Sequence, residues 1–84
     1  MKSYNECKKI AMSKAAEMGE KPTKAYDYGN AYMFTKNNYT AIGGALPIVI
    51  LKEDGKAVTM STYVNLYDEG KEEFEININT GARK

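Results

Sequence analysis

Hydrophobic and polar positions divide the chain into segments, and the most apolar segment lies at its centre. Residues 45–60 read ALPIVILKEDGKAVTM, in which seven uncharged residues precede a polar turn and a shorter alternating run follows it. Asp54-Gly55 can supply the positive backbone angles that a short hairpin loop requires. The pattern therefore predicts two antiparallel strands, and we expect the rest of the chain to cover or extend them.

Two registers of this hairpin are compatible with the pattern. With Asp54-Gly55 as a two-residue loop, one face carries Val49, Leu51, Val58 and Met60. With a type I turn at Glu53-Asp54 and Gly55 as a left-handed bulge, that face carries Ile48, Ile50, Val58 and Met60. We favour the bulge because it groups the two isoleucines with Val58 and Met60. A slip of one residue exchanges the two faces of a strand, so the choice decides which residues form the core.

The N-terminal segment has the pattern of an amphipathic helix. Ser3 and Glu6 have the spacing of a capping box, and Gly19 lies where a left-handed helix cap belongs. An apolar stripe with helical spacing connects these two ends and consists of Tyr4, Cys7, Ala11, Ala15 and Met18. We therefore expect a helix through Met18 that packs closely on a sheet.

Three further segments alternate in the way that strands do. Aromatic residues alternate through residues 24–34, which predicts a strand that is clearest over 31–35, with a bulge or strand start at Gly29-Asn30. Residues 39–42 are expected to return antiparallel before Gly43-Gly44. Residues 74–78 alternate apolar and polar, which predicts a final half-buried strand.

The segment at 61–69 fits either a strand or a helix. We favour a short helix, with Ser61 or Thr62 as its cap and Gly70 as its stop. Taken together, the pattern predicts an α+β fold in which an N-terminal helix packs on a three- to four-stranded antiparallel sheet. We expect a single domain over 1–84, with 1–2 and 80–84 frayed.

The amino-acid composition argues against several classes of function. The 84 residues include one cysteine and no histidine, and 12 basic residues nearly balance 11 acidic ones. A lone cysteine agrees with a reducing compartment, no signal-peptide pattern follows Met1, and no apolar run is long enough to cross a bilayer. We therefore expect a cytoplasmic protein that binds no membrane, and the balanced charge argues against nucleic acid.

The residues that could serve in catalysis or metal binding are better explained by structural roles. Without histidine the chain cannot form a Ser-His or Cys-His pair and lacks the commonest general base and zinc ligand. Cys7 lies on the apolar stripe, where cysteine packs as a small hydrophobe. The acidic run at 68–75 lacks the spacing of a calcium loop. We therefore predict that the protein is not an enzyme, with no catalytic residue, metal site or cofactor.

An alternative function is based on Gly43-Gly44. These glycines lack the lysine and Ser/Thr that complete a phosphate-binding loop, so we expect a glycine turn or bulge there. The alternative to protein binding is a small-ligand-binding domain with a pocket near Gly43, Gly44 and Tyr39.

The main functional expectation follows from the sheet face that the N-terminal helix leaves uncovered. One helix covers one face of a small sheet, so the second face is expected to stay bare and apolar and to require a protein partner or self-association. Tyrosine is favoured at such interfaces because it combines apolar area with a polar tip. The expected partner-binding residues are Tyr28, Tyr32, Val49, Leu51, Tyr63 and Tyr67.

Four sequence features occur in an order known from one family. They are Tyr32-Met33-Phe34, the run GALPIVI at 44–50, Asp54-Gly55-Lys56, and a segment from Tyr63 to Tyr67. This order resembles small α+β immunity proteins of bacterial polymorphic toxin systems, of the immunity protein 35 type. The resemblance spans 31–67, and it implies a protein that binds and blocks a cognate toxin without catalysing a reaction.

Overall fold

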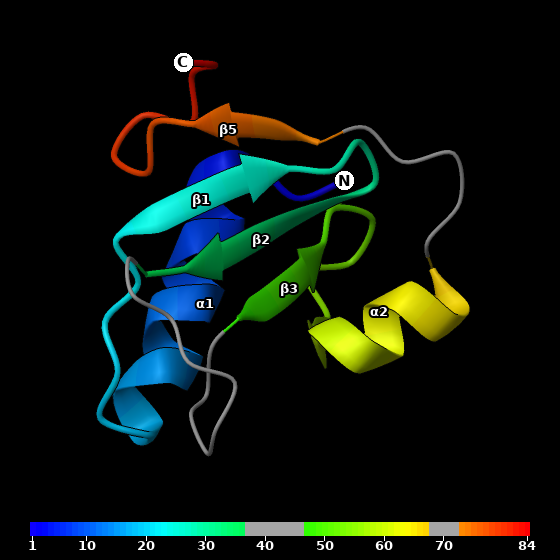
Figure 1. The fold of residues 1–84 in the computed structure, drawn as a ribbon, viewed down its shortest axis with the longest axis horizontal. Coiled ribbons are helices and arrows are strands. Elements are labelled where there is room, and N and C mark those ends of the chain that lie inside the picture. Colours follow the sequence, from blue (N-terminus) through cyan, green and yellow to red (C-terminus); the bar gives the residue numbers. More distant parts are fainter. Residues whose placement is uncertain (37–46, 68–72) are drawn as a thin grey trace.

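The computed structural model describes residues 1–36, 47–67 and 73–84, which form an antiparallel sheet with a helix on each face (Figure 1). The strand order is β4-β3-β2-β1-β5. In chain order, the elements are α1 (Tyr4–Glu17), β1 (Lys24–Asp27), β2 (Ala31–Thr35), β3 (Ile48–Leu51), β4 (Ala57–Thr59), α2 (Met60–Leu66) and β5 (Phe74–Ile76). The predicted α+β class with an N-terminal helix on an antiparallel sheet is confirmed, although the sheet has five strands instead of three or four.

Helix α1 begins and ends where its local signals place it. The Ser3 hydroxyl accepts a hydrogen bond from the Glu6 N–H, and the Glu6 carboxylate accepts one from the Ser3 N–H, both at 3.2 Å. This reciprocal capping box satisfies two donors that the first helical turn leaves free. Met18 caps the C-terminal end, and Gly19 follows with a φ of 72°, a left-handed conformation that glycine adopts without strain.

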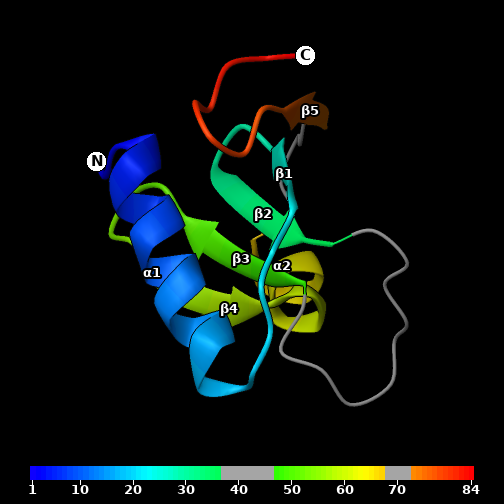
Figure 2. The same ribbon diagram turned by 90° about the vertical axis from the view of Figure 1, so that its left-hand side faces the viewer.

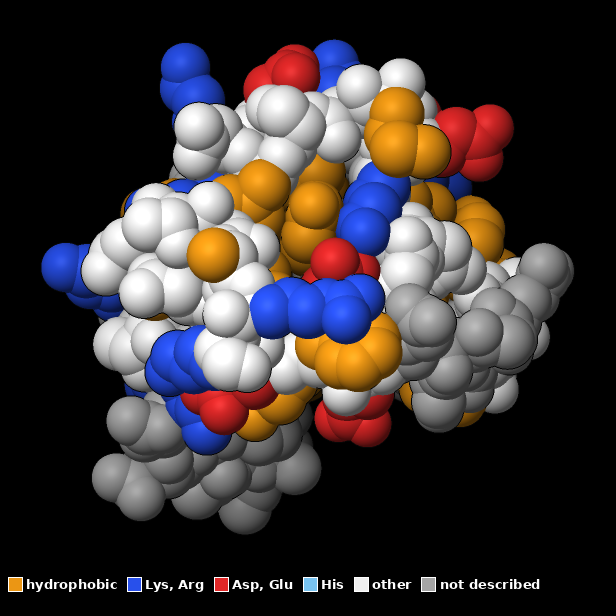
Figure 3. All heavy atoms as spheres, turned by 90° about the horizontal axis from the view of Figure 1, so that it is seen from above, with side chains coloured by type: hydrophobic (Ala, Val, Ile, Leu, Met, Phe, Trp, Pro, Cys, Tyr) orange, Lys and Arg blue, Asp and Glu red, His pale blue; other side chains and the backbone are white. Residues whose placement is uncertain are grey.

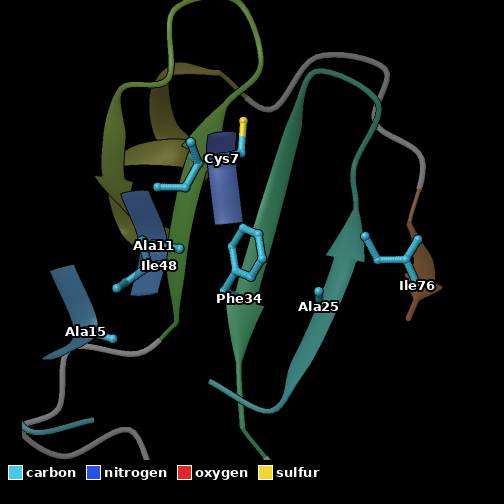
Figure 4. Packing of buried hydrophobic residues seen from close by; sticks show 8 residues of the cluster. Cys7, Ala11, Ala15, Ala25, Phe34, Ile48 and Ile76 are labelled. Atoms are coloured by element: carbon cyan, nitrogen blue, oxygen red, sulfur yellow. The ribbon is translucent and has the colours of Figure 1, made fainter. Parts of the chain in front are cut away.

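The first face of the sheet packs against α1. Cys7, Ala11 and Ala15 are fully buried, and their small side chains let the helix lie close to β2 and β3 (Figure 4). The same cluster contains the strand residues Ala25, Phe34, Ile48, Ile50 and Ile76. The prediction that Cys7 packs as a small hydrophobe is confirmed.

The predicted strand over 24–34 is two strands. The Tyr28 N–H donates to the Ala31 carbonyl at 2.9 Å, so Gly29-Asn30 forms a two-residue reversal instead of a bulge or strand start. Gly29 has a φ of 90°, which a tight hairpin of this kind requires at its first position. The Asp27 carboxylate accepts the Gly29 N–H at 2.8 Å and stabilises the turn.

The favoured register of the central hairpin is wrong. The structure pairs Val49 with Val58 and Ile50 with Ala57, one residue away from the bulge register and two away from the two-residue loop. The Gly55 N–H donates to the Leu51 carbonyl at 2.8 Å, so the connection is a four-residue loop over 52–55. The faces agree with the alternative that we did not favour, because Val49, Leu51, Val58 and Met60 share the second face.

Helix α2 confirms the favoured interpretation of the ambiguous segment, although its cap is Thr59 and not Ser61 or Thr62. The Thr59 hydroxyl accepts a hydrogen bond from the Thr62 N–H at 3.1 Å. Helix α2 lies on the opposite side of the sheet from α1, next to β3 and β4 (Figure 2). Gly70, the predicted stop, and the return strand predicted over 39–42 fall outside the described residues.

The C-terminal segment corrects a further expectation. Strand β5 lies within the predicted 74–78 strand, but the tail at 80–84 is hydrogen-bonded instead of frayed. The Asn77 N–H donates to the Ala82 carbonyl at 2.7 Å, and the Lys84 N–H donates to the Glu75 carbonyl at 3.1 Å. At the other terminus, the Lys2 N–H donates to the Lys52 carbonyl at 2.7 Å. Neither helix in the described part of the chain is long and apolar enough to cross a membrane.

Candidate functional site

Four of the six expected partner-binding residues are part of the core. Tyr28, Val49, Leu51 and Tyr63 belong to a buried cluster on the second face of the sheet, in which Val49 is 0% and Tyr63 is 1% exposed. The expectation of a bare apolar face is therefore wrong at β3. The second face is covered by α2, a second helix, whose Tyr63 lies on this face and closes it.

The other two residues, Tyr32 and Tyr67, lie apart. Tyr32 is half-buried on the first face, where its ring meets the Tyr4 ring edge-on at a centroid distance of 5.0 Å. Tyr67 follows the last turn of α2 and packs on the second-face cluster. The structure therefore does not join the six residues into one accessible surface.

Polar contacts fasten α2 to the sheet at one end. The Asn30 amide oxygen accepts a hydrogen bond from the Tyr63 hydroxyl at 2.5 Å, and the Asn30 amide nitrogen donates to the Tyr67 carbonyl at 2.8 Å. The Lys52 ammonium lies 2.8 Å from the Asp27 carboxylate and 4.5 Å from the centre of the Tyr32 ring. These contacts tie together two hairpin loops and α2.

These contacts shift the pKa of Asp27. Burial acts to raise the pKa, but the hydrogen bond from Lys52, the Gly29 N–H and the nearby positive charge outweigh it, so the pKa lies below its ordinary value. A hollow of about 440 Å³ next to these groups is lined by Met1, Asn30, Leu51, Lys52, Glu53 and Tyr67. Because Asn30 and Lys52 already have intramolecular partners, this hollow offers a ligand few free polar groups.

The expected ligand-binding residues of the alternative function are not among the described residues. Gly43, Gly44 and Tyr39 fall outside the described residues, as do residues 68–72 of the acidic run. Among the residues with described positions, no three His, Cys, Asp or Glu side chains come together as metal ligands. Burial raises the pKa of the Cys7 thiol, and the neighbouring Glu6 charge adds to this effect, which keeps the sulfur in its less reactive form.

The two edges of the sheet differ. The outer side of β5 is covered by the chain itself, because Arg83 bridges to Ile76 and the Lys84 N–H donates to Glu75. The Arg83 guanidinium also lies 3.8 Å from the centre of the Phe74 ring. Seen from this end of the molecule, hydrophobic side chains occur in small patches broken by charged ones (Figure 3).

Strand β4 forms the other edge, and no described strand lies beyond it. The Leu51 N–H donates to the Lys56 carbonyl at 2.9 Å, and antiparallel pairs alternate between bonded and non-bonded, so Val58 directs its backbone groups toward β3. Ala57 and Thr59 therefore direct theirs away from the sheet. The Thr59 carbonyl is engaged by the first turn of α2, which leaves the Ala57 N–H and C=O and the Thr59 N–H facing outward.

A groove lies beside this edge on the first face. It has a volume of about 300 Å³ and lies between the C-terminal end of α1 and the β4 edge. Its lining includes Met18, Pro47, Ile48, Ala57 and Thr59, and its charged rim is formed by Lys14 and Glu17. Val58 also borders the groove, although its side chain packs on the second-face cluster. The small side chain of Ala57 leaves the edge open to an approaching chain.

Sequence reasoning missed this edge. The hairpin signal at residues 45–60 identified β4 as a strand, but strand order depends on which distant segments pair. The only local indication was that α2 follows β4 directly, so the chain does not continue into a neighbouring strand at that point.

Comparisons with protein-family models, with curated proteins and with solved structures found no match to this chain.

Proposed function

We propose that this chain is a non-catalytic protein-binding module that binds by adding a strand of its partner to the β4 edge. The observation that carries the proposal is the contrast between the two sheet edges. The β5 edge is paired with the chain's own C-terminal segment, whereas the β4 edge directs backbone donors and acceptors outward beside an apolar groove.

Strand addition matches the chemistry of this edge. The main-chain groups of Ala57 and Thr59 would bond an extended backbone, which gives affinity without regard to sequence. Alternate side chains of that strand would face the groove between α1 and β4, where apolar residues are favoured by its lining. Specificity would come from this groove.

The scarcity of reactive side chains supports a binding role over a catalytic one. The sequence has no histidine, and the only cysteine is buried within the α1 stripe with a raised pKa. Among the ion pairs of the described residues, the most enclosed is that of Lys52 with Asp27, which holds two loops together. An immunity-type inhibitor of a bacterial toxin is the form of this function that the sequence resemblance implies, and a toxin gene adjacent to the coding sequence would support it.

The experiment compares capture of protein partners by the wild-type chain and by two variants of one position. In Ala57→Pro the ring replaces the outward N–H and blocks an approaching strand, while the β3–β4 bonds stay intact. Ala57→Ser keeps the donor and the small size. We expect a partner that wild type and Ala57→Ser retain and that Ala57→Pro loses, with unchanged circular dichroism. Equal capture by all three would overturn the β4 surface.

A further inference from the structure

We infer that the strand added to β4 comes from a second copy of this chain, a partner assignment that rests on the proposed function. An antiparallel pair of identical strands is related by a two-fold axis, so the same patch serves both copies. Two of the outward groups of β4, the Thr59 N–H and the Ala57 carbonyl, are placed to hydrogen-bond within such a pair. With the axis at Val58, the Thr59 N–H of each copy would donate to the Ala57 carbonyl of the other.

The side chains of β4 allow the two edges to approach. Thr59 keeps an extended backbone, with φ −75° and ψ 161°, up to the start of α2. On the second face, Val58 would lie opposite Val58 of the second copy, and directly opposed β-branched residues pack favourably. On the first face, the small Ala57 leaves the groove free at the contact.

The charges on the groove rim are self-complementary. Lys14 and Glu17 line the groove, both are exposed, and neither has an ion-pair partner among the described residues. A two-fold axis through β4 turns the two copies of α1 antiparallel on the same face of the joined sheet, so Lys14 of each copy would approach Glu17 of the other. A rim of one sign would repel itself, whereas this rim attracts its symmetry mate.

The length of β4 sets the expected strength. A three-residue edge contributes few main-chain bonds, and short edges resist pairing, so the dimer should be weak and reversible. We expect sedimentation equilibrium to show a rising mass between about 10 µM and about 1 mM, which corresponds to a dissociation constant on the order of 100 µM. Ala57→Pro should stay monomeric over this range, and Ala57→Ser should dimerise like wild type.

A charge-exchange experiment tests the geometry. Lys14→Glu and Glu17→Lys each give a rim of one sign, so each variant alone should dimerise about tenfold more weakly than wild type. An equimolar mixture of the two should recover association, because the acidic rim of one then meets the basic rim of the other. Since both positions are exposed on α1, the variants should keep wild-type thermal stability.

The outcomes separate the two proposals. A wild-type chain that remains monomeric at about 1 mM, or variants that dimerise alone as strongly as in the mixture, would overturn the second-copy assignment. The proposed function would survive that result if capture of a different protein still depended on Ala57. Dimerisation lost in Ala57→Pro and restored in the charge-exchanged mixture would support the assignment.

Discussion

The Tyr63 hydroxyl donates a hydrogen bond to the Asn30 amide oxygen at 2.5 Å, which joins α2 to the turn between β1 and β2. The Asn30 amide nitrogen in turn donates a hydrogen bond to the Tyr67 carbonyl at 2.8 Å. Tyr63 is the one buried residue of α2, while Val64 and Leu66 are 48% and 67% exposed. Asn30 therefore holds in place the helix that closes the second face.

Asn30→Ala should loosen α2 without unfolding the sheet. The substitution removes both side-chain bonds to the helix, and we expect a loss of about 1–3 kcal/mol in the free energy of unfolding. Hydrogen exchange should accelerate in α2 while α1 stays protected. Asn65→Ala, at an exposed position of the same helix, is the matched control and should change neither quantity. Uniform acceleration throughout the chain would contradict this role of Asn30.

Gly81 and Gly19 provide a matched pair for the C-terminal turn. Both have left-handed backbones, with φ of 81° and 72°, so alanine strains each by about 1 kcal/mol. A Cβ on Gly81 would lie 2.6 Å from Cδ2 of Tyr4, whereas a Cβ on Gly19 would meet nothing within 4 Å. We expect Gly81→Ala to lower the melting temperature clearly more than Gly19→Ala. Equal shifts would mean that the turn does not pack against α1.

Asp27 should make stability depend on acid pH. Its pKa is lowered in the folded state because the bonds from Lys52 and Gly29 outweigh the effect of burial. A carboxyl of this kind stabilises the fold above its unfolded pKa, and the contribution disappears as the pH falls through the folded pKa. We expect Asp27→Asn to cost about 1 kcal/mol at neutral pH and less below about pH 4.

Chemical denaturation over a pH series measures this effect. Glu53→Gln, which neutralises an exposed carboxylate in the neighbouring loop, should give a difference from wild type that stays near zero across the series. A pH-independent cost of Asp27→Asn would show that the ion pair with Lys52 contributes nothing through charge.

Tyr4 should limit stability at alkaline pH. Burial, assisted by the neighbouring Tyr32, raises the pKa of Tyr4 to about 12, and its hydroxyl donates to the Ile78 carbonyl at 2.5 Å. A group whose pKa is raised on folding stabilises the protein fully below its unfolded pKa, near 10, and loses that contribution as the pH rises toward 12. Absorbance titration of the phenols and denaturation between these values measure the loss. Tyr4→Phe should reduce the alkaline decline, and a decline identical to wild type would contradict it.

Features whose sequence signals lie within a few neighbouring residues were predicted better than features that depend on distant residues. The capping box at Ser3 and Glu6 and the glycine after Met18 identified α1 correctly, because a helix end is decided by neighbouring residues. The short helix after β4 was also identified, with its cap misplaced by two or three residues. The hairpin register was wrong because Gly55 closes a four-residue loop, and residue type alone did not distinguish this from a bulge.

The candidate site was predicted less well than the fold. The expected residues at Tyr28, Val49, Leu51 and Tyr63 do lie together, but as core, because a helix of seven residues packs on them. An apolar strand residue has the same sequence signature whether a partner or the chain itself covers it. The β4 edge was missed because pairing between β1 and β5, which lie far apart in sequence, helps determine which strand lies at each edge.

By itself, the sequence determined the α+β class, the first helix with both its ends, the hairpin around Asp54-Gly55 and the existence of a last strand. These features follow from spacing and turn chemistry within a few residues. Only the tertiary structure decided the register, the face that α2 covers, the covered β5 edge and the β4 edge, beyond which no described strand lies. Those outcomes depend on which distant segments meet, and local periodicity does not encode that choice.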